Sequence, residues 1–339
     1  MSRSGWVRSL GATSSSVLVT LFGLILITFL IGRVMPIDPV IAIVGDHAPP
    51  DVIEQVRVEL ALDRPLPVQF WIYVRNLLHG DLGRSVMTSN TVLSDIGHFF
   101  PATMELATVA IVGATLVGVP LGVLAAVRQG HRIDHIVRVV CLTGQSVPIF
   151  LLGLLALLVF YATLGWAPGT GRQDVIYQGD VAPMTGLLTV DALIAGNWDA
   201  LWDALAHLVL PASVLAYFSM AYITRMTRSF MLEALHGEYI ITARAKGLSP
   251  LRVIWRHAFG NIAVRLVTVL ALTYAGLLEG AVVTETIFSW PGLGQYLTVS
   301  LLNADMNAVL GATLIIGMTY LALNLGADLL YRLLDPRAQ

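Results

Sequence analysis

The side chains that could do chemistry in this chain are few and widely spaced. Lys246 is its only lysine, and it lies in the segment Ala245-Lys246-Gly247. A phosphate-binding P-loop needs a glycine-rich turn ending in Gly-Lys-Ser/Thr, so that backbone amides and the lysine hold the phosphates. The chain therefore lacks this ATP-binding motif. The Gly-Leu-Gly and Gly-Thr-Gly segments at 292–294 and 169–171 lack the third glycine of a dinucleotide site, and we read them as turns.

Metal ligands are equally sparse. His131 and His135 are four residues apart, but their only acidic neighbour is Asp134, and isolated histidine pairs in loops are usually solvated. Cys141 is the single cysteine, which excludes an intrachain disulfide and a multi-cysteine metal site. We predict no metal site.

Catalytic side chains do not form a recognisable set either. An intramembrane hydrolase needs a serine and a histidine, or paired aspartates, at matching depth. Ser146 and His207 lie in different apolar segments with no motif around either residue. We therefore predict a non-catalytic protein.

Ionisable residues inside apolar segments are candidates for transport pathways. Glu105, Glu279 and Asp328 lie near the ends of such segments, where each could reach headgroups or water. The middle of a segment, where a proton relay would lie, holds no charge, which argues against a proton-coupled transporter. Gln145 and Ser146 are deeper and could line a pathway or join two helices by hydrogen bonds.

The elements that carry these residues are membrane spans. Hydrophobic residues make up 56% of the chain and charged residues 12%, about half the usual 25% for soluble domains. Mean hydropathy is +0.76, and the net charge of −2 neither favours nor excludes a nucleic-acid partner. A spanning helix needs roughly 20 apolar residues. We predict about six, near 13–32, 104–127, 136–164, 205–224, 262–284 and 308–331. Pro120, Pro148 and Pro211 lie inside these spans, and we expect them to cause tolerable kinks.

The charges between these spans predict their orientation. Arginines concentrate in the short segments that share a side with the N-terminus, whereas residues 165–204 carry several aspartates and one arginine, Arg172. Basic residues mark the cytoplasmic side, so both termini are predicted to be cytoplasmic. Arg33-Val34-Met35-Pro36 follows the first span where a signal peptide would have a small-residue cleavage site, so we predict that this span is retained.

Two regions outside the spans are long enough to fold. In the outer region 33–101, residues 51–62 have helical spacing after Pro49-Pro50. In the inner region 225–261, good helix formers run from Glu238 to Lys246. Gly247 then predicts a helix end, and Ser249-Pro250 predicts the start of a second helix.

The segment 238–249, Glu-Tyr-Ile-Ile-Thr-Ala-Arg-Ala-Lys-Gly-Leu-Ser, resembles the coupling loop of bacterial ATP-binding-cassette (ABC) importer permeases. It is most similar to the dipeptide/oligopeptide branch. The general family pattern is Glu-Ala-Ala-x3-Gly-x9-Ile-x-Leu-Pro. Aligned on Gly247, this chain keeps one alanine and the glycine, and its departures are those of the peptide branch.

Further stretches resemble the larger, B-type permease subunit of that branch. These stretches are residues 62–66 with 80–85, residues 164–168 and residues 285–294. Their order extends the resemblance over nearly the whole chain, thinning before residue 60.

The resemblance implies an all-α integral membrane protein with the type I ABC importer permease fold. Residues 1–100 would hold the first span and an outer loop, residues 101–332 the transmembrane domain with the coupling loop, and residues 333–339 a cytoplasmic tail. It also implies a second permease subunit, two ATPase subunits that carry ATP and Mg²⁺, an extracytoplasmic solute-binding protein and membrane lipid as partners. No cofactor is expected on this chain and no nucleic acid among its partners.

In such proteins the coupling loop docks into a cleft on the ATPase. The expected contacts in this chain are Glu238, Tyr239, Thr242, Ala243, Arg244, Ala245, Lys246, Gly247 and Leu248. The small residues would permit close approach, and the two cations could bond the partner. The implied solute is a peptide or a related small solute such as a nickel chelate, an opine or an oligosaccharide. The alternative is a secondary transporter or channel that works without an ATPase.

Overall fold

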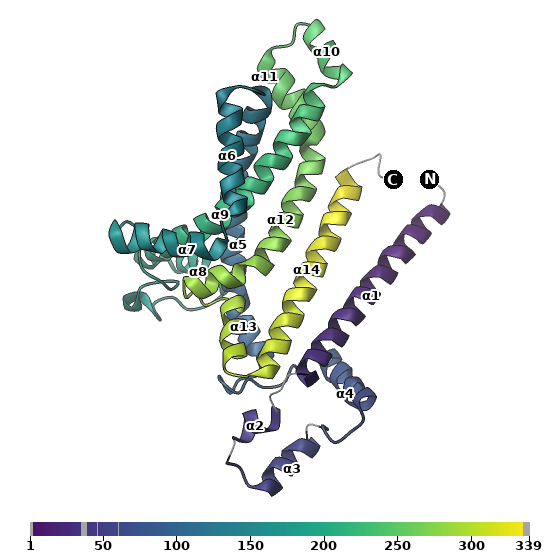
Figure 1. Ribbon diagram of the computed structural model, residues 1–339, viewed down its shortest axis with the longest axis vertical. Coiled ribbons are helices and arrows are strands. Elements are labelled where there is room, and N and C mark those ends of the chain that lie inside the picture. Colours follow the sequence, from purple (N-terminus) through teal and green to yellow (C-terminus); the bar gives the residue numbers. More distant parts are fainter. Residues whose placement is uncertain (1–2, 35–38, 46, 60, 335–339) are drawn as a thin grey trace. The chain divides into compact units, whose positions relative to one another are not determined.

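The computed structural model describes residues 3–34, 39–45, 47–59 and 61–334 (Figure 1). Within these ranges the regular secondary structure is helical, with one isolated bridge between Arg84 and Thr91 and no strand. Helices satisfy their own backbone hydrogen bonds, which a lipid environment requires. The all-α prediction is confirmed.

Five helices in the described chain are long and apolar enough to cross a membrane. A helix pair bent by 101° gives a sixth crossing if it is counted as one broken span. The five are parts of α1 (Arg3–Val34), α5 (Val92–Val127), α9 (Trp198–Leu235), the α11 to α12 run (Pro250–Ile287) and α14 (Met306–Leu334). The expected number of spans is therefore matched only with the bent pair included.

The bent pair departs from the single helix that we expected over residues 136–164. Helix α6 (Arg132–Ser146) ends before Pro148, and α7 (Ile149–Ala156) continues into a π-helix over Leu157–Thr163. Val147 is extended, with φ −84° and ψ 123°. Proline disfavours the helical conformation of the residue before it, and at Pro148 one helix ends and the next starts. We expected only a tolerable kink there.

The chain forms two compact units. One comprises residues 1–101 and 292–321, and the other comprises residues 102–291 and 322–339. The remaining elements are α2 (Pro39–Val44), α3 (Pro50–Glu59), α4 (Leu66–Leu78), the 3₁₀ turn Val175–Tyr177, α8 (Leu188–Ala195), α10 (Glu238–Ala245), α11 (Pro250–Arg252), the π-helix Val253–Phe259, α12 (Gly260–Ile287) and α13 (Leu293–Leu302).

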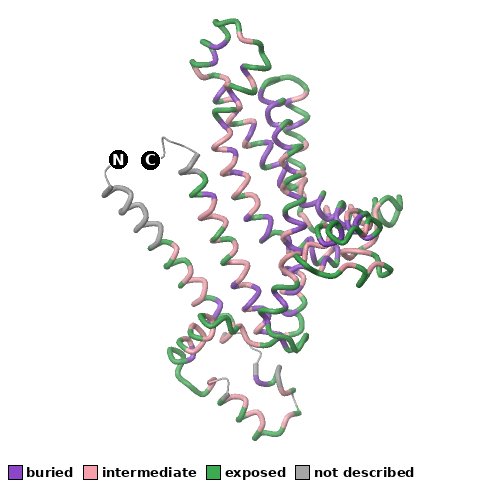
Figure 2. The backbone as a smooth tube through the Cα atoms, turned by 180° about the vertical axis from the view of Figure 1, so that it is seen from behind, coloured by how far each residue is buried: buried purple, intermediate pink, exposed green. Residues whose placement is uncertain are grey.

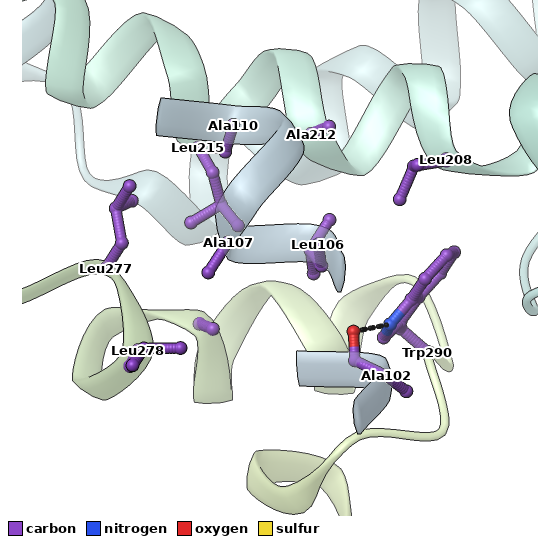
Figure 3. Packing of buried hydrophobic residues seen from close by; sticks show 11 residues of the cluster. Ala102, Leu106, Ala107, Ala110, Leu208, Ala212, Leu215, Leu277, Leu278 and Trp290 are labelled. Atoms are coloured by element: carbon purple, nitrogen blue, oxygen red, sulfur yellow. Dashed lines mark hydrogen bonds between the residues drawn. The ribbon is translucent and has the colours of Figure 1, made fainter. Parts of the chain in front are cut away.

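The larger unit is built around α9, which contacts α6, α7, α8 and α12. Figure 2 shows its neighbouring helices with buried residues along their facing sides. Alanines on α5 and α9 let the helices approach closely around Leu106, Leu208 and Leu278 (Figure 3). Trp290 closes this cluster and donates a hydrogen bond from its indole nitrogen to the Ala102 carbonyl at 3.0 Å. This packing fixes α5, α9 and α12 as one body.

In the smaller unit, buried carboxylates accept hydrogen bonds that hold its loops in place. Asp95 accepts hydrogen bonds from Thr88, at 2.5 Å, and from the Tyr296 hydroxyl, at 3.0 Å. Asp305 accepts from the Ser85 hydroxyl at 2.5 Å. Burial, together with the nearby Asp95 charge, raises the pKa of Tyr296 above its ordinary value. The resulting network holds residues 85–95 against α13 and the start of α14.

Candidate functional site

The segment that resembles a coupling loop forms a helical tip between α9 and α12 (Figure 1). Helix α10 begins after Gly237 and ends before Lys246. Gly247 adopts a left-handed φ of +74°, and its amide donates to the Arg244 carbonyl at 2.9 Å. Ser249 and Pro250 then start α11. The glycine stop and the proline start lie where the sequence predicts them.

Buried apolar side chains attach this tip to the long helices. Ile240 and Ala243 of α10 lie in one cluster with Met231 of α9, Val253 of the π-helix and Ile262 of α12. Ile240 and Ile262 are fully buried. These side chains therefore connect α10 to both α9 and α12 through close packing.

The other side of the tip is exposed, as the green trace in Figure 2 shows. Of the predicted contact residues, those with exposed side chains or backbone are Glu238, Tyr239, Thr242, Arg244, Ala245, Lys246 and Gly247. Ala243 is buried and Leu248 half-buried against the same internal cluster. Ala243 therefore packs inside this chain, and its contact with a partner stays a prediction.

Sequence reasoning missed two exposed apolar residues of the tip. Ile241 is 65% exposed, directly beside the buried Ile240, and Leu251 at the start of α11 is exposed as well. These two side chains place apolar surface on the exposed part of the tip. Helical periodicity is the signal that could have found Ile241, because it lies one residue from the inward-facing position.

Helices α9 and α12, which carry the tip, also line a cavity of about 580 Å³. Its walls come from the break between α6 and α7, from α9 and from α12. The lining residues include Gln145, Ser146, Phe218, Ser219, Tyr222, Thr273, Gly276 and Gly280. The wall is largely apolar with a few hydroxyl and amide groups, the composition typical of a small-molecule site.

Of the two roles that the sequence left open for Gln145, the structure shows the hydrogen bond between helices, and it places the side chain in the cavity wall. The Gln145 side-chain oxygen accepts a hydrogen bond from Arg225 of α9 at 2.7 Å. Arg225 also lies over the Tyr222 ring, 5.5 Å from its centroid. The Arg225 guanidinium is therefore held at the edge of the cavity, beside the C-terminal end of α6.

We expected Glu105 to reach headgroups or water, but the structure places it elsewhere. It is buried and accepts two hydrogen bonds from Arg172, with Nη2 at 2.5 Å and Nε at 3.1 Å. The amide and hydroxyl of Thr189 donate to its other oxygen. This charge-assisted pair anchors the 165–197 segment to α5. Glu279 and Asp328 are exposed within the chain.

A second carboxylate organises the same segment. Asp191 of α8 accepts hydrogen bonds from the Thr185 hydroxyl, at 2.7 Å, and from backbone amides over residues 184–186. Burial alone would raise the pKa of Asp191, but these hydrogen bonds outweigh it and hold the pKa below its ordinary value. The described residues contain no cluster of three or more His, Cys, Asp or Glu that could hold a metal.

Comparison with known proteins identifies the architecture. Residues 118–339 match the family described as binding-protein-dependent transport system inner membrane component. The chain belongs to this family. Residues 7–107 of the permease match the corresponding N-terminal family, so the likeness reaches well before residue 60, where the sequence motifs thinned. The predicted family is confirmed, and the permease is a multi-pass inner-membrane protein.

Curated relatives cover nearly the whole permease. A "Probable D,D-dipeptide transport system permease protein" of Escherichia coli K12 is 43% identical over 93% of this chain and 92% of its own length. A di/tripeptide transport system permease protein of Pseudomonas aeruginosa is 42% identical over 94% of both chains. The dipeptide transport system permease protein of E. coli K12 is 42% identical over 95% of both.

Proposed function

We propose that this permease is one of two transmembrane subunits of an ATP-driven importer of di- and oligopeptides. The observation that carries the proposal is its similarity, over more than nine-tenths of its length, to relatives named as peptide permeases. Both termini and the 236–259 tip are cytoplasmic, in line with the arginine bias of these segments.

Its partners are a second, homologous permease, two ATPase subunits that bind ATP and Mg²⁺, and an extracytoplasmic solute-binding protein. The ATPase docks on the exposed side of α10. Arg244 and Lys246 supply cations there, and Tyr239 and Ile241 supply apolar surface. The lack of a P-loop in this sequence agrees with ATP binding on another chain.

Coupling runs through α9 and α12. Closure of the ATPases around ATP moves α10, which is packed on both helices through Ile240 and Ala243. The same helices form two walls of the 580 Å³ cavity, so their movement changes its shape. A rigid-body displacement of packed helices is sufficient for this and needs no local unfolding.

Co-purification tests the proposal. The permease is expressed with the genes that neighbour its own, purified through a C-terminal tag, and assayed for ATPase activity in detergent. We expect two ATPase subunits and a second permease in the complex, and ATP hydrolysis that rises when a peptide-loaded binding protein is added. A permease that purifies alone and transports dipeptides in liposomes without an ATPase would overturn the proposal and favour a secondary transporter.

The same experiment can also test which class of solute is transported. The binding protein is loaded in turn with a dipeptide, a pentapeptide, a nickel chelate and an oligosaccharide, and ATP hydrolysis is compared. Stimulation by peptides and by neither of the other ligands supports the peptide assignment. Stimulation only by the chelate or only by the oligosaccharide would support the importer function but overturn the assignment of peptides as its substrates.

A further inference from the structure

A cavity of about 270 Å³ lies in the smaller unit, where the first apolar span ends. Phe29 and Arg33 of α1, Gln69 and Tyr73 of α4, and Asp81 contribute to its lining. A water molecule occupies about 30 Å³ in the liquid, so the cavity has room for a ligand of several heavy atoms. It shares no lining residue with the cavity between α6, α9 and α12.

Arg33 supplies a positive charge to this cavity. Its guanidinium lies over the Phe29 ring, 5.4 Å from the centroid. Among the described residues no carboxylate comes within 4.0 Å of it, and its buried Nε has no hydrogen-bond partner. A partly buried arginine without a counter-charge is unfavourable, and its planar donor edge suits a phosphate or carboxylate.

Gln69 adds an acceptor to the cavity wall. Its side chain is only 7% exposed, and its amide nitrogen donates to the carbonyls of Leu62, at 3.2 Å, and Arg64, at 2.7 Å. These two bonds fix the orientation of the amide, so that the side-chain oxygen is left buried and without a partner. Asp81 places a carboxylate in the same wall. The cavity thus combines one cation with acceptors, which matches a zwitterion.

The position of the cavity indicates the source of that zwitterion. Arg33 is the last residue of the apolar span Ser15–Arg33, so it lies at headgroup depth. Helix α4 packs on this end of α1, with the Phe29 and Phe70 rings 5.2 Å apart. It turns Trp71, 67% exposed, and Leu78 outward. Exposed tryptophan beside a span end is characteristic of the membrane interface.

We propose that this cavity binds the headgroup of a zwitterionic, amine-bearing phospholipid such as phosphatidylethanolamine. Arg33 holds the phosphate, and Asp81 and the Gln69 oxygen accept from the ammonium group. A free dipeptide carries the same two charges. The depth of the site favours the lipid, whose acyl chains would continue along the exposed apolar face of α1.

Native mass spectrometry of the purified transporter complex tests this assignment. The complex is delipidated and then offered dioleoyl phosphatidylethanolamine, dioleoyl phosphatidylglycerol, phosphoethanolamine or dialanine. We expect retention of phosphatidylethanolamine, reduced about tenfold by Arg33→Gln, because that substitution removes a charged hydrogen bond. Arg75→Gln is the matched control, since Arg75 is exposed on α4 and outside the cavity lining.

Asp81→Asn is a second test of the site, in which Arg33 is unchanged. It should lower the preference for phosphatidylethanolamine over phosphatidylglycerol, because only the former carries an ammonium group. Equal retention in Arg33→Gln and Arg75→Gln overturns the site, as does an unchanged lipid preference in Asp81→Asn. Binding of dialanine or phosphoethanolamine as tight as that of the lipid overturns the lipid as the ligand.

Discussion

Arg228 of α9 clamps Asp134 of α6 through two parallel hydrogen bonds, Nε to Oδ1 at 2.7 Å and Nη2 to Oδ2 at 2.9 Å. Asp134 is buried and also accepts from the Gly130 amide at 3.0 Å. The pair joins the start of α6 to the helix that carries the 236–259 tip. It was not predicted from the sequence, where Asp134 stood out only as the acidic neighbour of two histidines.

Asp134→Asn should destabilise the permease by about 3 kcal/mol, because breaking a buried ion pair leaves the other charge uncompensated. The midpoint of thermal unfolding in detergent, followed by tryptophan fluorescence, measures the change. Arg138→Gln is the control, since Arg138 lies 3.8 Å from Asp134 and is half-exposed. Its effect should stay below about 1 kcal/mol. Equal shifts in the two variants would contradict the clamp.

Alanine substitutions of the adjacent residues Ile240 and Ile241 should have different effects, one on the stability of the permease and the other on ATPase docking. Ile240→Ala removes a fully buried side chain and should cost about 2–5 kcal/mol in unfolding free energy. Ile241→Ala should change stability by less than about 0.5 kcal/mol because the side chain is exposed. It should nevertheless reduce the amount of ATPase that co-purifies. Normal ATPase recovery with Ile241→Ala would remove this residue from the docking surface.

Gly247 is the position where backbone conformation and surface bulk can be told apart. A Cβ added there would meet no atom within 4 Å, so only its φ of +74° resists substitution. A left-handed conformation costs a residue with a side chain roughly 1–2 kcal/mol, and asparagine tolerates it better than valine. We expect Gly247→Asn to retain more ATPase binding than Gly247→Val, with normal membrane insertion in both. Equal loss in the two would mean that bulk at the docking surface, and not the turn, is what matters.

Filling the larger cavity should block transport without dissociating the complex. Gly276 lines this cavity, and a Cβ there meets nothing within 4 Å, so Gly276→Trp can place an indole in the open space. Uptake of a labelled dipeptide into proteoliposomes should fall to background while the ATPases still co-purify. Gly326→Trp is the control, because Gly326 of α14 is equally unobstructed and outside the cavity lining. Undiminished uptake with Gly276→Trp would exclude this cavity from the pathway.

Local chemistry explains what the sequence predicted well. Gly247, Ser249 and Pro250 act on their own backbone, so the end of α10 and the start of α11 follow from residue type. The apolar runs likewise predict helices wherever lipid offers no hydrogen-bond partner. Pro148 was noticed, but whether a proline kinks a helix or turns it by 101° depends on the neighbours that pack around the break.

Contacts between distant residues explain what the sequence missed. Glu105 was expected to reach headgroups or water, yet Arg172, from a loop far along the chain, buries and neutralises it. Ala243 has the composition expected of a docking surface, but the packing of α10 on α9 and α12 turns it inward. A small side chain suits either face of a helix, and only its neighbours decide between them.

The sequence by itself determined the membrane environment, the helical class and the family, because these depend on composition, on runs of apolar residues and on short motifs. Only the tertiary structure decided which face of the 238–249 segment is exposed and that α9 and α12 serve both the tip and the cavity. It also decided that no carboxylate of the described residues lies within 4.0 Å of the Arg33 guanidinium. Each of these depends on which side chains of remote segments meet, and the free energy of such contacts is not encoded in any one stretch of the chain.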